Sequence, residues 1–294
     1  MNVAIVKMYT QDDYNRKTAA PHFGVYGKGG VGKSRLCCDL AAEPLNLRVF
    51  YLETEGKPLP DGLANLVYSR GGAVTHVDTT ADLESVCGDY HTARANYDAV
   101  VVDGWSASNR QGIEERKAKD ARWSYLEEMR AMHRALILLK NAGNPIFSTM
   151  GETWQPTNLR RDLSDPNSKH YGEIVSEGLV PEEERKYTVG LPKALIEQWP
   201  PTFVVLGRLR VQLPRGTANP AKLRWIQLME MPGKEDAKSE YHDDHYPGLV
   251  LPYGTNAAFL LMHPWLREVR PLSTEQQDYL DKYNAWKKKG ITAT

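Results

Sequence analysis

The first half of the chain alternates short apolar runs with stretches of helical spacing. Residues 97–106 contain a near-continuous run of valines, which is typical of a strand buried on both faces at the centre of a parallel sheet. The same pattern predicts further strands at 22–27, 47–55, 73–78 and 145–151, and helices at 32–43 and 79–95. This alternation predicts an α/β fold with a mostly parallel, doubly wound sheet flanked by helices.

A long helix is predicted at roughly 110–142, and Gly143 and Pro145 should end it. Its apolar residues recur every three or four positions and form one stripe: Ala118, Ala121, Tyr125, Met129, Met132, Leu136 and Leu139. The opposite face carries charged residues: Glu114, Glu115, Arg116, Lys117, Glu127, Glu128 and Arg130. We expect the stripe to face the core and the charged face to be exposed to solvent.

The pattern changes after residue 151. Residues 152–191 are polar and predict loops, whereas 202–211 and 222–231 read as strands on either side of a turn. These two strands predict an antiparallel addition to the sheet toward the C-terminus. Residues 256–262 fit either a strand or a helix, and 273–289 predict a C-terminal helix whose final lysines complement its dipole.

Composition narrows the class of protein. The chain has 294 residues, of which 41% are hydrophobic and 25% charged, as in ordinary globular proteins. Its formal net charge is zero, which argues against a broad positive field for gripping duplex DNA, but leaves room for a local basic groove. Neither a long apolar run nor a signal-like N-terminus is seen, so we expect a cytoplasmic protein without a membrane partner.

Residues 27–34, GKGGVGKS, match the phosphate-binding P-loop motif, with a predicted strand before it and a predicted helix after it. Glycines allow backbone N–H groups to converge on phosphate oxygens without clashes from Cβ atoms. Lys33 should reach the β- and γ-phosphates of ATP, and the Ser34 hydroxyl should bind Mg²⁺. The loop residues predicted to bind ATP are Gly27, Lys28, Gly29, Gly30, Val31, Gly32, Lys33, Ser34 and Arg35.

Acidic and hydroxyl residues at the ends of other predicted strands complete a hydrolytic site. Asp103 follows the valine run and should join Ser34 in holding Mg²⁺. Glu53 and Glu55 are two positions apart, so both should point to the same face of the strand. Glu55 is the expected general base, with Glu53 as the alternative, because Glu55 lies nearer the strand end, where an attacking water would sit. Ser148 and Thr149 are candidate sensors of the γ-phosphate, and Thr149 is counted among the nucleotide-binding residues.

These motifs together resemble the RecA-type ATPase core, in particular phage single-strand annealing recombinases and related phage nucleotide-binding proteins. The resembling segments span about residues 22–211 and include VYGKGGVGKSRL, VFYLETEG, YDAVVVDGWSA and NPIFSTMGE. The resemblance implies that Lys33 and Glu55 are catalytic and that Asp103 is the acidic residue of the magnesium site. It also implies ATP hydrolysis, side-by-side assembly of copies on single-stranded DNA, and a location in the host cytoplasm if a phage encodes the chain.

The expected organisation is an N-terminal strand and linker at 1–21, a RecA-like ATPase core at 22–270, and a C-terminal helix and tail at 271–294.

The chain departs from the RecA-type pattern at two places. The family's sensor is usually Gln or His, where this chain has Ser, Thr and Met. In place of the family's basic finger, the chain offers Lys234 and Lys238.

A second resemblance is to the ParA/MinD type of ATP-dependent dimeric switch, whose P-loop carries an additional lysine at the position of Lys28. That class usually has Asp-x-Asp-Pro-Gln after its second strand, where this chain reads LETEGKP. The downstream residues therefore favour the RecA type. Two other possibilities are another type of P-loop NTPase and a protein that binds nucleotide without turnover.

Two further segments are candidates for binding. Residues 152–191 have the aromatic and basic composition that suits single-stranded nucleic acid, with Trp154, Arg160, Arg161, Lys169, His170 and Tyr171. A plain surface insertion explains this segment as well. The stretch at 241–248 contains His242, Asp243, Asp244 and His245, but this spacing in a loop indicates a solvated turn more than a metal site.

Overall fold

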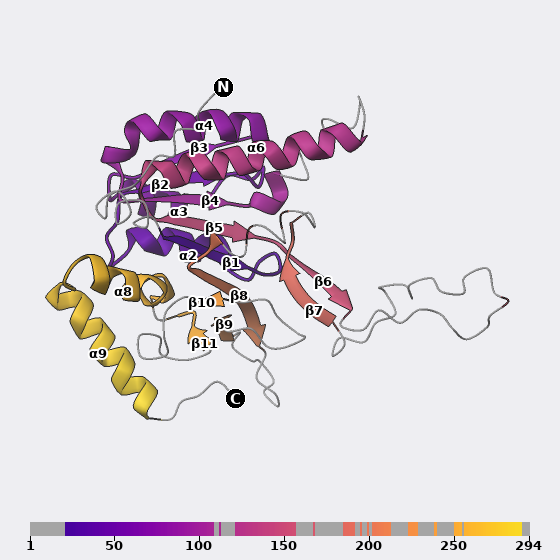
Figure 1. Ribbon diagram of the computed structural model, residues 1–294. Helices are drawn as coiled ribbons and strands as arrows, with labels where there is room; N and C mark the ends of the chain where they lie inside the picture. The colour runs from indigo at the N-terminus through magenta and orange to yellow at the C-terminus, as the bar shows by residue number, and fades with distance from the viewer. Residues whose placement is uncertain are drawn as a thin grey trace, which may run out of the picture.

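The computed structural model describes residues 21–108, 112, 121–156, 167, 185–191, 195, 199, 202–212, 223–228, 238–239, 250–254 and 256–289. In this part of the chain, nine strands form one sheet (Figure 1). Eight of them follow the order β11-β9-β8-β1-β5-β4-β2-β3, and β10 pairs with β8. The fold is therefore α/β, with a mostly parallel sheet flanked by helices.

The parallel part of the sheet contains six strands: β1 (His22–Tyr26), β2 (Val49–Glu53), β3 (Ala73–His76), β4 (Ala99–Asp103), β5 (Ile146–Met150) and β8 (Val205–Gln212). The antiparallel part contains β9 (Leu223–Gln227), β10 (Lys238–Ser239) and β11 (Val250–Pro252). Strands β6 (Glu152–Pro156) and β7 (Arg185–Val189) form a separate antiparallel ribbon. This ribbon continues from the end of β5 and projects from that edge of the sheet (Figure 1).

Helices cover both faces of the sheet. On one face lie α4 (Thr80–Ala93) and α6 (Ala121–Ala142). On the other lie α2 (Lys33–Cys38), α3 (Asp61–Tyr68), α8 (Ala257–Val269) and α9 (Thr274–Lys288). Short 3-10 turns follow α2 at Asp39–Ala41 and α4 at Arg94–Asn96.

Strand β4 shows how the sequence builds the two cores. Val100 and Val102 lie in the core with α4 and α6, whereas Ala99 and Val101 lie in the core with α2 and α8. Successive side chains of a strand point to opposite faces, so a strand covered on both sides must be apolar at every position. All five residues of β4 are buried, including the polar residue at its end, Asp103.

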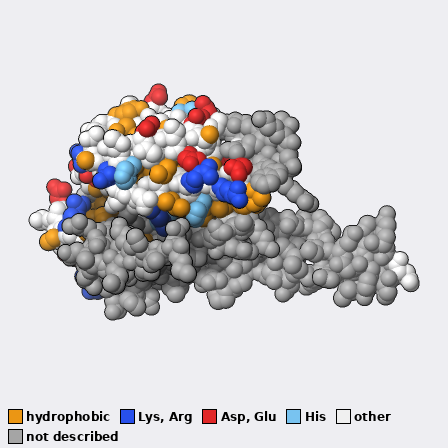
Figure 2. All heavy atoms as spheres, turned by 45° about the horizontal axis from the view of Figure 1, so that its top comes forward, with side chains coloured by type: hydrophobic (Ala, Val, Ile, Leu, Met, Phe, Trp, Pro, Cys, Tyr) orange, Lys and Arg blue, Asp and Glu red, His pale blue; other side chains and the backbone are white. Residues whose placement is uncertain are grey.

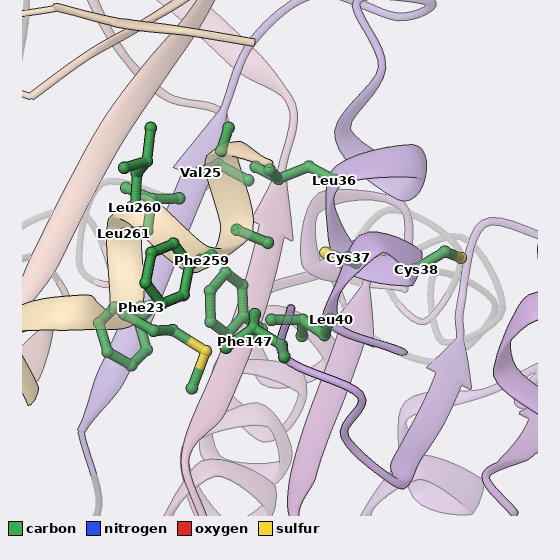
Figure 3. Close-up of a cluster of buried hydrophobic side chains, with 14 of the residues drawn as sticks. Phe23, Val25, Leu36, Cys37, Cys38, Leu40, Phe147, Phe259, Leu260 and Leu261 are labelled. Atoms are coloured by element: carbon green, nitrogen blue, oxygen red, sulfur yellow. The ribbon is translucent and has the colours of Figure 1, made fainter. Parts of the chain in front are cut away.

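Helix α8 closes the core on the face of the P-loop helix α2. Phe259, Leu260 and Leu261 lie beside the side chains of β1, β5 and α2 (Figure 3). The ring of Phe259 meets the ring of Tyr279 on α9 edge to face, with 5.3 Å between centroids. Helix α9 begins with a capping box in which Ser273 and Gln276 each accept a hydrogen bond from the other's backbone N–H.

Most of the predicted elements are confirmed, with ends that differ by a few residues. The antiparallel addition is confirmed, because β8 pairs antiparallel with β9. The ambiguous segment 256–262 is helical, because it forms the first half of α8. Helix α3 was not predicted, and its eight residues include a glycine that weakens the helical pattern. Residues 1–20 of the predicted N-terminal strand and linker, and all but residue 112 of the predicted helix between 110 and 120, lie outside the described residues.

Two predictions about exposure and loops are wrong. The segment 152–191 is not all loop, since its two ends form β6 and β7. Glu128 was placed on the solvent face of the long helix, but it is fully buried. It accepts a hydrogen bond from the Thr80 hydroxyl of α4. In the predicted stripe, Met132, Leu136 and Leu139 are buried and Met129 packs against the same core, whereas Ala118 and the side chain of Ala121 lie outside the described residues. The helical period could not show that α4 packs close enough to cover a neighbouring glutamate.

No helix in the part of the chain that the structure describes is long and apolar enough to cross a membrane.

We expect Phe259→Ala to lower the free energy of unfolding by roughly 3–5 kcal/mol, because it leaves a cavity where α8 meets β1, β5 and α9. The matched control is Val269→Ala at the end of the same helix, where the side chain is 54% exposed. This control should change the free energy by less than about 0.5 kcal/mol. Chemical denaturation measures both, and equal losses would show that α8 does not pack as described.

Candidate functional site

The P-loop joins β1 to α2 and is held from both sides at its first residue. The backbone N–H of Gly27 donates to the Met150 carbonyl at the end of β5, at 3.3 Å. On the other side, a Cβ atom on Gly27 would lie 2.6 Å from the Leu209 carbonyl oxygen of β8. The motif's first glycine is therefore required by the close approach of the neighbouring strand, and the loop starts from a fixed position.

Lys33 folds back over the loop. Its side chain is buried, and Nζ donates to the carbonyl oxygens of Gly27 and Lys28, at 3.0 Å each. An ammonium group has three N–H donors, and these two contacts hold it at the mouth of the loop. A phosphate bound by the loop would meet this positive charge directly.

The rest of the loop is exposed at its tip and buried at its base. Lys28, Gly29 and Gly30 are exposed, whereas Val31 packs in the core beneath the loop. Gly30 and Gly32 have φ angles of 75° and 105°, which favour glycine. Of the two residues that follow Lys33, Ser34 is half-buried, and Arg35 is exposed and pairs with Asp39 at 2.8 Å.

Four polar residues form a row across the carboxyl ends of neighbouring parallel strands. Thr149 of β5 is the register partner of Asp103 of β4. Asp103 is in turn the partner of Glu53 of β2, and Glu53 is the partner of His76 of β3. Register partners in a parallel sheet share a face, so these side chains line one edge beside the P-loop. The carboxyl edge of such a sheet is where ligands bind in open α/β folds.

Asp103 is buried, and hydroxyl groups orient its carboxylate. Thr149 Oγ1 donates to Oδ1 at 2.5 Å, and the Tyr51 hydroxyl donates to Oδ2. Burial, and next the charge of Asp103, raise the pKa of Tyr51, so the phenol stays a neutral donor. The backbone N–H and hydroxyl of Thr54 donate to the Asp103 carbonyl at 3.0 and 2.9 Å.

This arrangement fits the magnesium ion that the motif implies. Each carboxylate oxygen can accept more than one hydrogen bond, so both oxygens of Asp103 keep capacity toward a metal ion or its waters. With the Ser34 hydroxyl, the donors are all hard oxygen atoms, and Mg²⁺ prefers a few such protein ligands plus water and phosphate. Among the described residues, no cluster of three or more His, Cys, Asp or Glu side chains offers a competing metal site.

The two sensor candidates lie on opposite faces of β5. Ser148 is fully buried away from the P-loop helix, where it contacts His22 Nε2 at 2.7 Å and accepts from Trp105 Nε1 at 2.9 Å. Thr149 faces Asp103. The period of two along the strand therefore leaves Thr149 as the candidate sensor and gives Ser148 to the core.

The two glutamates of the candidate base have different environments. Strand β2 ends at Glu53, so the expectation that Glu55 belongs to the same strand is wrong. Glu53 is buried, and its Oε2 lies 3.2 Å from His76 Nδ1. Glu55 is exposed in the following turn, where its Cγ would lie 2.4 Å from a Cβ atom on Gly104. Glu55 therefore stands over the residue that follows Asp103.

His76 lies between two carboxylates. Its Nδ1 contacts Glu53, and its Nε2 lies 2.7 Å from Asp78 Oδ1. The hydrogen bond to Glu53, with help from Asp78, raises the pKa of His76 above its ordinary value, although partial burial opposes this. The remaining oxygen of Glu53, Oε1, is buried without a hydrogen-bond partner among the described residues.

Three residues of the site were missed by the sequence analysis: Tyr51, His76 and Tyr253. Tyr51 carries a signal that could have been used, because it lies two positions before Glu53 and must share its face. His76 lies near the end of the strand predicted at 73–78 and could have been placed at the same edge. Tyr253 donates from its hydroxyl to the Gly32 carbonyl at 2.8 Å, across 221 positions of sequence, and nothing local predicts that contact.

Other predicted contacts lie outside the described residues, namely the side chains of Trp154, Lys234 and Lys238 and the segments 157–166, 168–184 and 241–248.

The cysteines of α2 are core residues. Cys37 and Cys38 are buried, and burial raises the pKa of Cys38 to about 12. Neither thiol is therefore a reactive nucleophile at neutral pH.

We expect His76→Gln to cost more stability at about pH 5 than at about pH 8. A histidine whose pKa is raised by folding stabilises the native state fully below its ordinary pKa of about 6.5, and this contribution is lost as the pH rises through the folded pKa. Denaturant titrations of both proteins at the two pH values measure the difference. The exposed His133 of α6 provides the control, His133→Gln. A pH-independent cost for His76→Gln would contradict the pairing with Glu53.

Comparison with known proteins adds no family to this description. No protein-family model matches the chain. No curated protein matches it either. The function therefore has to be inferred from the P-loop and the row of polar residues beside it.

Proposed function

We propose that this protein is a Mg²⁺-dependent ATPase with a RecA-like core, which acts on single-stranded DNA in phage-type recombination or annealing. One observation carries the ATPase proposal: Lys33 of a P-loop and the buried carboxylate of Asp103 lie at one sheet edge, with Thr149 between them on β5. A glycine-rich turn without a phosphate function would not need an oriented carboxylate two strands away.

In the proposed reaction, the loop positions the triphosphate. The backbone N–H groups of the loop hold the β-phosphate, and Lys33 moves its ammonium group from the Gly27 and Lys28 carbonyls to the β- and γ-phosphates. Phosphoryl transfer depends mainly on positioning and on stabilising the charge that spreads over the γ-phosphate oxygens. Lys33 supplies that charge stabilisation at the end of the loop.

Other residues at this edge of the sheet would hold the metal ion and activate water. Ser34 and Asp103 would hold Mg²⁺, which neutralises phosphate charge when bound. Thr149 fixes the orientation of Asp103 and brings a hydroxyl to the space between the loop and the carboxylate. Glu55 is exposed beside Gly104, so water can reach it, and its carboxylate accepts the proton of the attacking water. Glu53 is less suited, because His76 already occupies one of its oxygens.

Two features support the RecA-type assignment over the ParA/MinD type. Residues 52–58 read LETEGKP, where the ParA/MinD class usually has Asp-x-Asp-Pro-Gln. The late strand pair of β8 and β9 also fits the RecA resemblance. Lys28 is the observation that keeps the alternative in view, since its side chain is exposed at the loop tip and can reach a partner.

The DNA-binding part of the proposal is supported by the ribbon of β6 and β7. It continues directly from β5, one residue after the strand that carries Thr149, so it starts at the nucleotide edge. Arg208 of β8 fixes its base, with Nε 3.0 Å from Glu152 Oε2 and the guanidinium 3.6 Å from the centre of the Tyr187 ring. Among the described residues on the face shown in Figure 2, basic and acidic side chains are interspersed, so these residues do not form the basic stripe of a DNA groove.

We expect Glu55→Gln to lower the rate of ATP hydrolysis by on the order of 10²–10⁴ while ATP still binds, because a general base is lost and the phosphate contacts remain. Phosphate release and ATP titration measure the two quantities. The matched control is Glu127→Gln, which removes an exposed carboxylate on α6 paired with Arg130. It should hydrolyse ATP at the wild-type rate.

Other outcomes separate the alternatives. A wild-type rate in Glu55→Gln together with a lost rate in Glu53→Gln would transfer the role of base to Glu53. A wild-type protein that binds ATP without releasing phosphate would show a nucleotide-binding protein without turnover. If single-stranded DNA leaves the wild-type rate unchanged, the DNA part of the proposal is wrong.

Lys28→Ala distinguishes the two families by size. Light scattering with a non-hydrolysable ATP analogue should show the same assembly for wild type and variant if the protein is RecA-like. A discrete ATP-dependent dimer that the substitution abolishes would instead support the ParA/MinD type.

A further inference from the structure

A tyrosine from the far end of the sheet contacts the P-loop. Tyr253 follows β11, and its hydroxyl donates to the carbonyl oxygen of Gly32 at 2.8 Å. Its ring lies against the same glycine, since a Cβ atom on Gly32 would be 3.0 Å from the Tyr253 hydroxyl oxygen. Gly32 therefore has two reasons to be glycine, a φ angle of 105° and this ring.

The backbone around Tyr253 is well fixed, so the contact does not depend on a loose side chain. The Tyr253 N–H donates to the Arg224 carbonyl at 2.9 Å, directly after β11 pairs with β9. The Arg224 guanidinium lies 5.8 Å from the centre of the Tyr253 ring, at cation–π range. Burial raises the pKa of Tyr253 further above neutrality, so the phenol remains protonated and can donate.

The hydrogen bond fixes more than one atom, because the peptide group is planar. The Gly32 carbonyl and the Lys33 N–H belong to one trans peptide and point in opposite directions. Tyr253 and the Leu36 N–H both donate to this carbonyl, the latter at 3.1 Å. Holding the carbonyl on the side of Tyr253 therefore aims the Lys33 N–H away from it, toward the hollow of the loop.

We propose that Tyr253 is a positioning residue for phosphate binding, which keeps the Lys33 N–H aimed at the triphosphate through its hydrogen bond to Gly32. This inference rests on the proposed nucleotide site. Strand β8 separates β9 and β11 from the P-loop strand β1. The antiparallel end of the sheet thereby stabilises the phosphate-binding conformation of the loop on the other side of β8.

The test removes only the hydroxyl, in Tyr253→Phe. The matched control is Tyr90→Phe in the opposite core, where the hydroxyl is buried without a hydrogen-bond partner among the described residues. One readout needs no nucleotide: amide hydrogen exchange of residues 30–36 should become faster in Tyr253→Phe and stay unchanged in Tyr90→Phe. The other is calorimetric titration with Mg·ATP and with inorganic triphosphate, which has no base or ribose.

We expect Tyr253→Phe to bind both ligands about fivefold more weakly than wild type, as for the loss of one hydrogen bond. Unchanged exchange, or faster exchange with wild-type affinity for both ligands, would overturn the inference. A loss confined to ATP would also overturn it, since the hydroxyl would then contact the nucleoside. If wild type binds neither ligand, the proposed function fails and phosphate positioning fails with it, whereas the exchange result still reports whether Tyr253 holds the loop.

Discussion

The register of three parallel strands is the constraint on which the candidate site depends. Strand β5 pairs with β1 on one side and with β4 on the other, so Thr149 lies opposite both Val25 and Asp103. The P-loop starts two residues after Val25, and its Gly27 N–H binds the Met150 carbonyl. A shift of β5 by one residue would turn Thr149 into the other core and bring Ser148 or Met150 to the phosphate edge.

The two faces of the sheet contribute differently to this edge. The core with α2 and α8 carries the row of polar residues at its margin, and Tyr51 extends from that core to the Asp103 carboxylate. The other core contains the Trp105 and Ser148 contact just behind the same strand ends. Buried hydrogen bonds therefore hold the strand ends from both sides, and a buried carboxylate needs such partners.

Much of this fold and part of the site could be predicted from the sequence. The valine run of β4 and the motif at 27–34 are local signals, and both were interpreted correctly as elements. The burial of Glu128, the ribbon of β6 and β7, and the contact of Tyr253 with Gly32 depend on segments far apart in the chain. A single sequence shows periodicity within an element, but it does not show which elements pack against each other. These three features depend on such packing.

A structure of the protein with Mg²⁺ and a non-hydrolysable ATP analogue tests the central claim most directly. The account predicts that the β- and γ-phosphates lie in the loop of residues 27–34, with Lys33 Nζ moved onto them from the Gly27 and Lys28 carbonyls. It also predicts that the metal lies between Ser34 and Asp103, with the γ-phosphate facing Thr149 and Glu55. The account would be contradicted if Lys33 Nζ stays on the Gly27 and Lys28 carbonyls, or if the nucleotide is bound elsewhere.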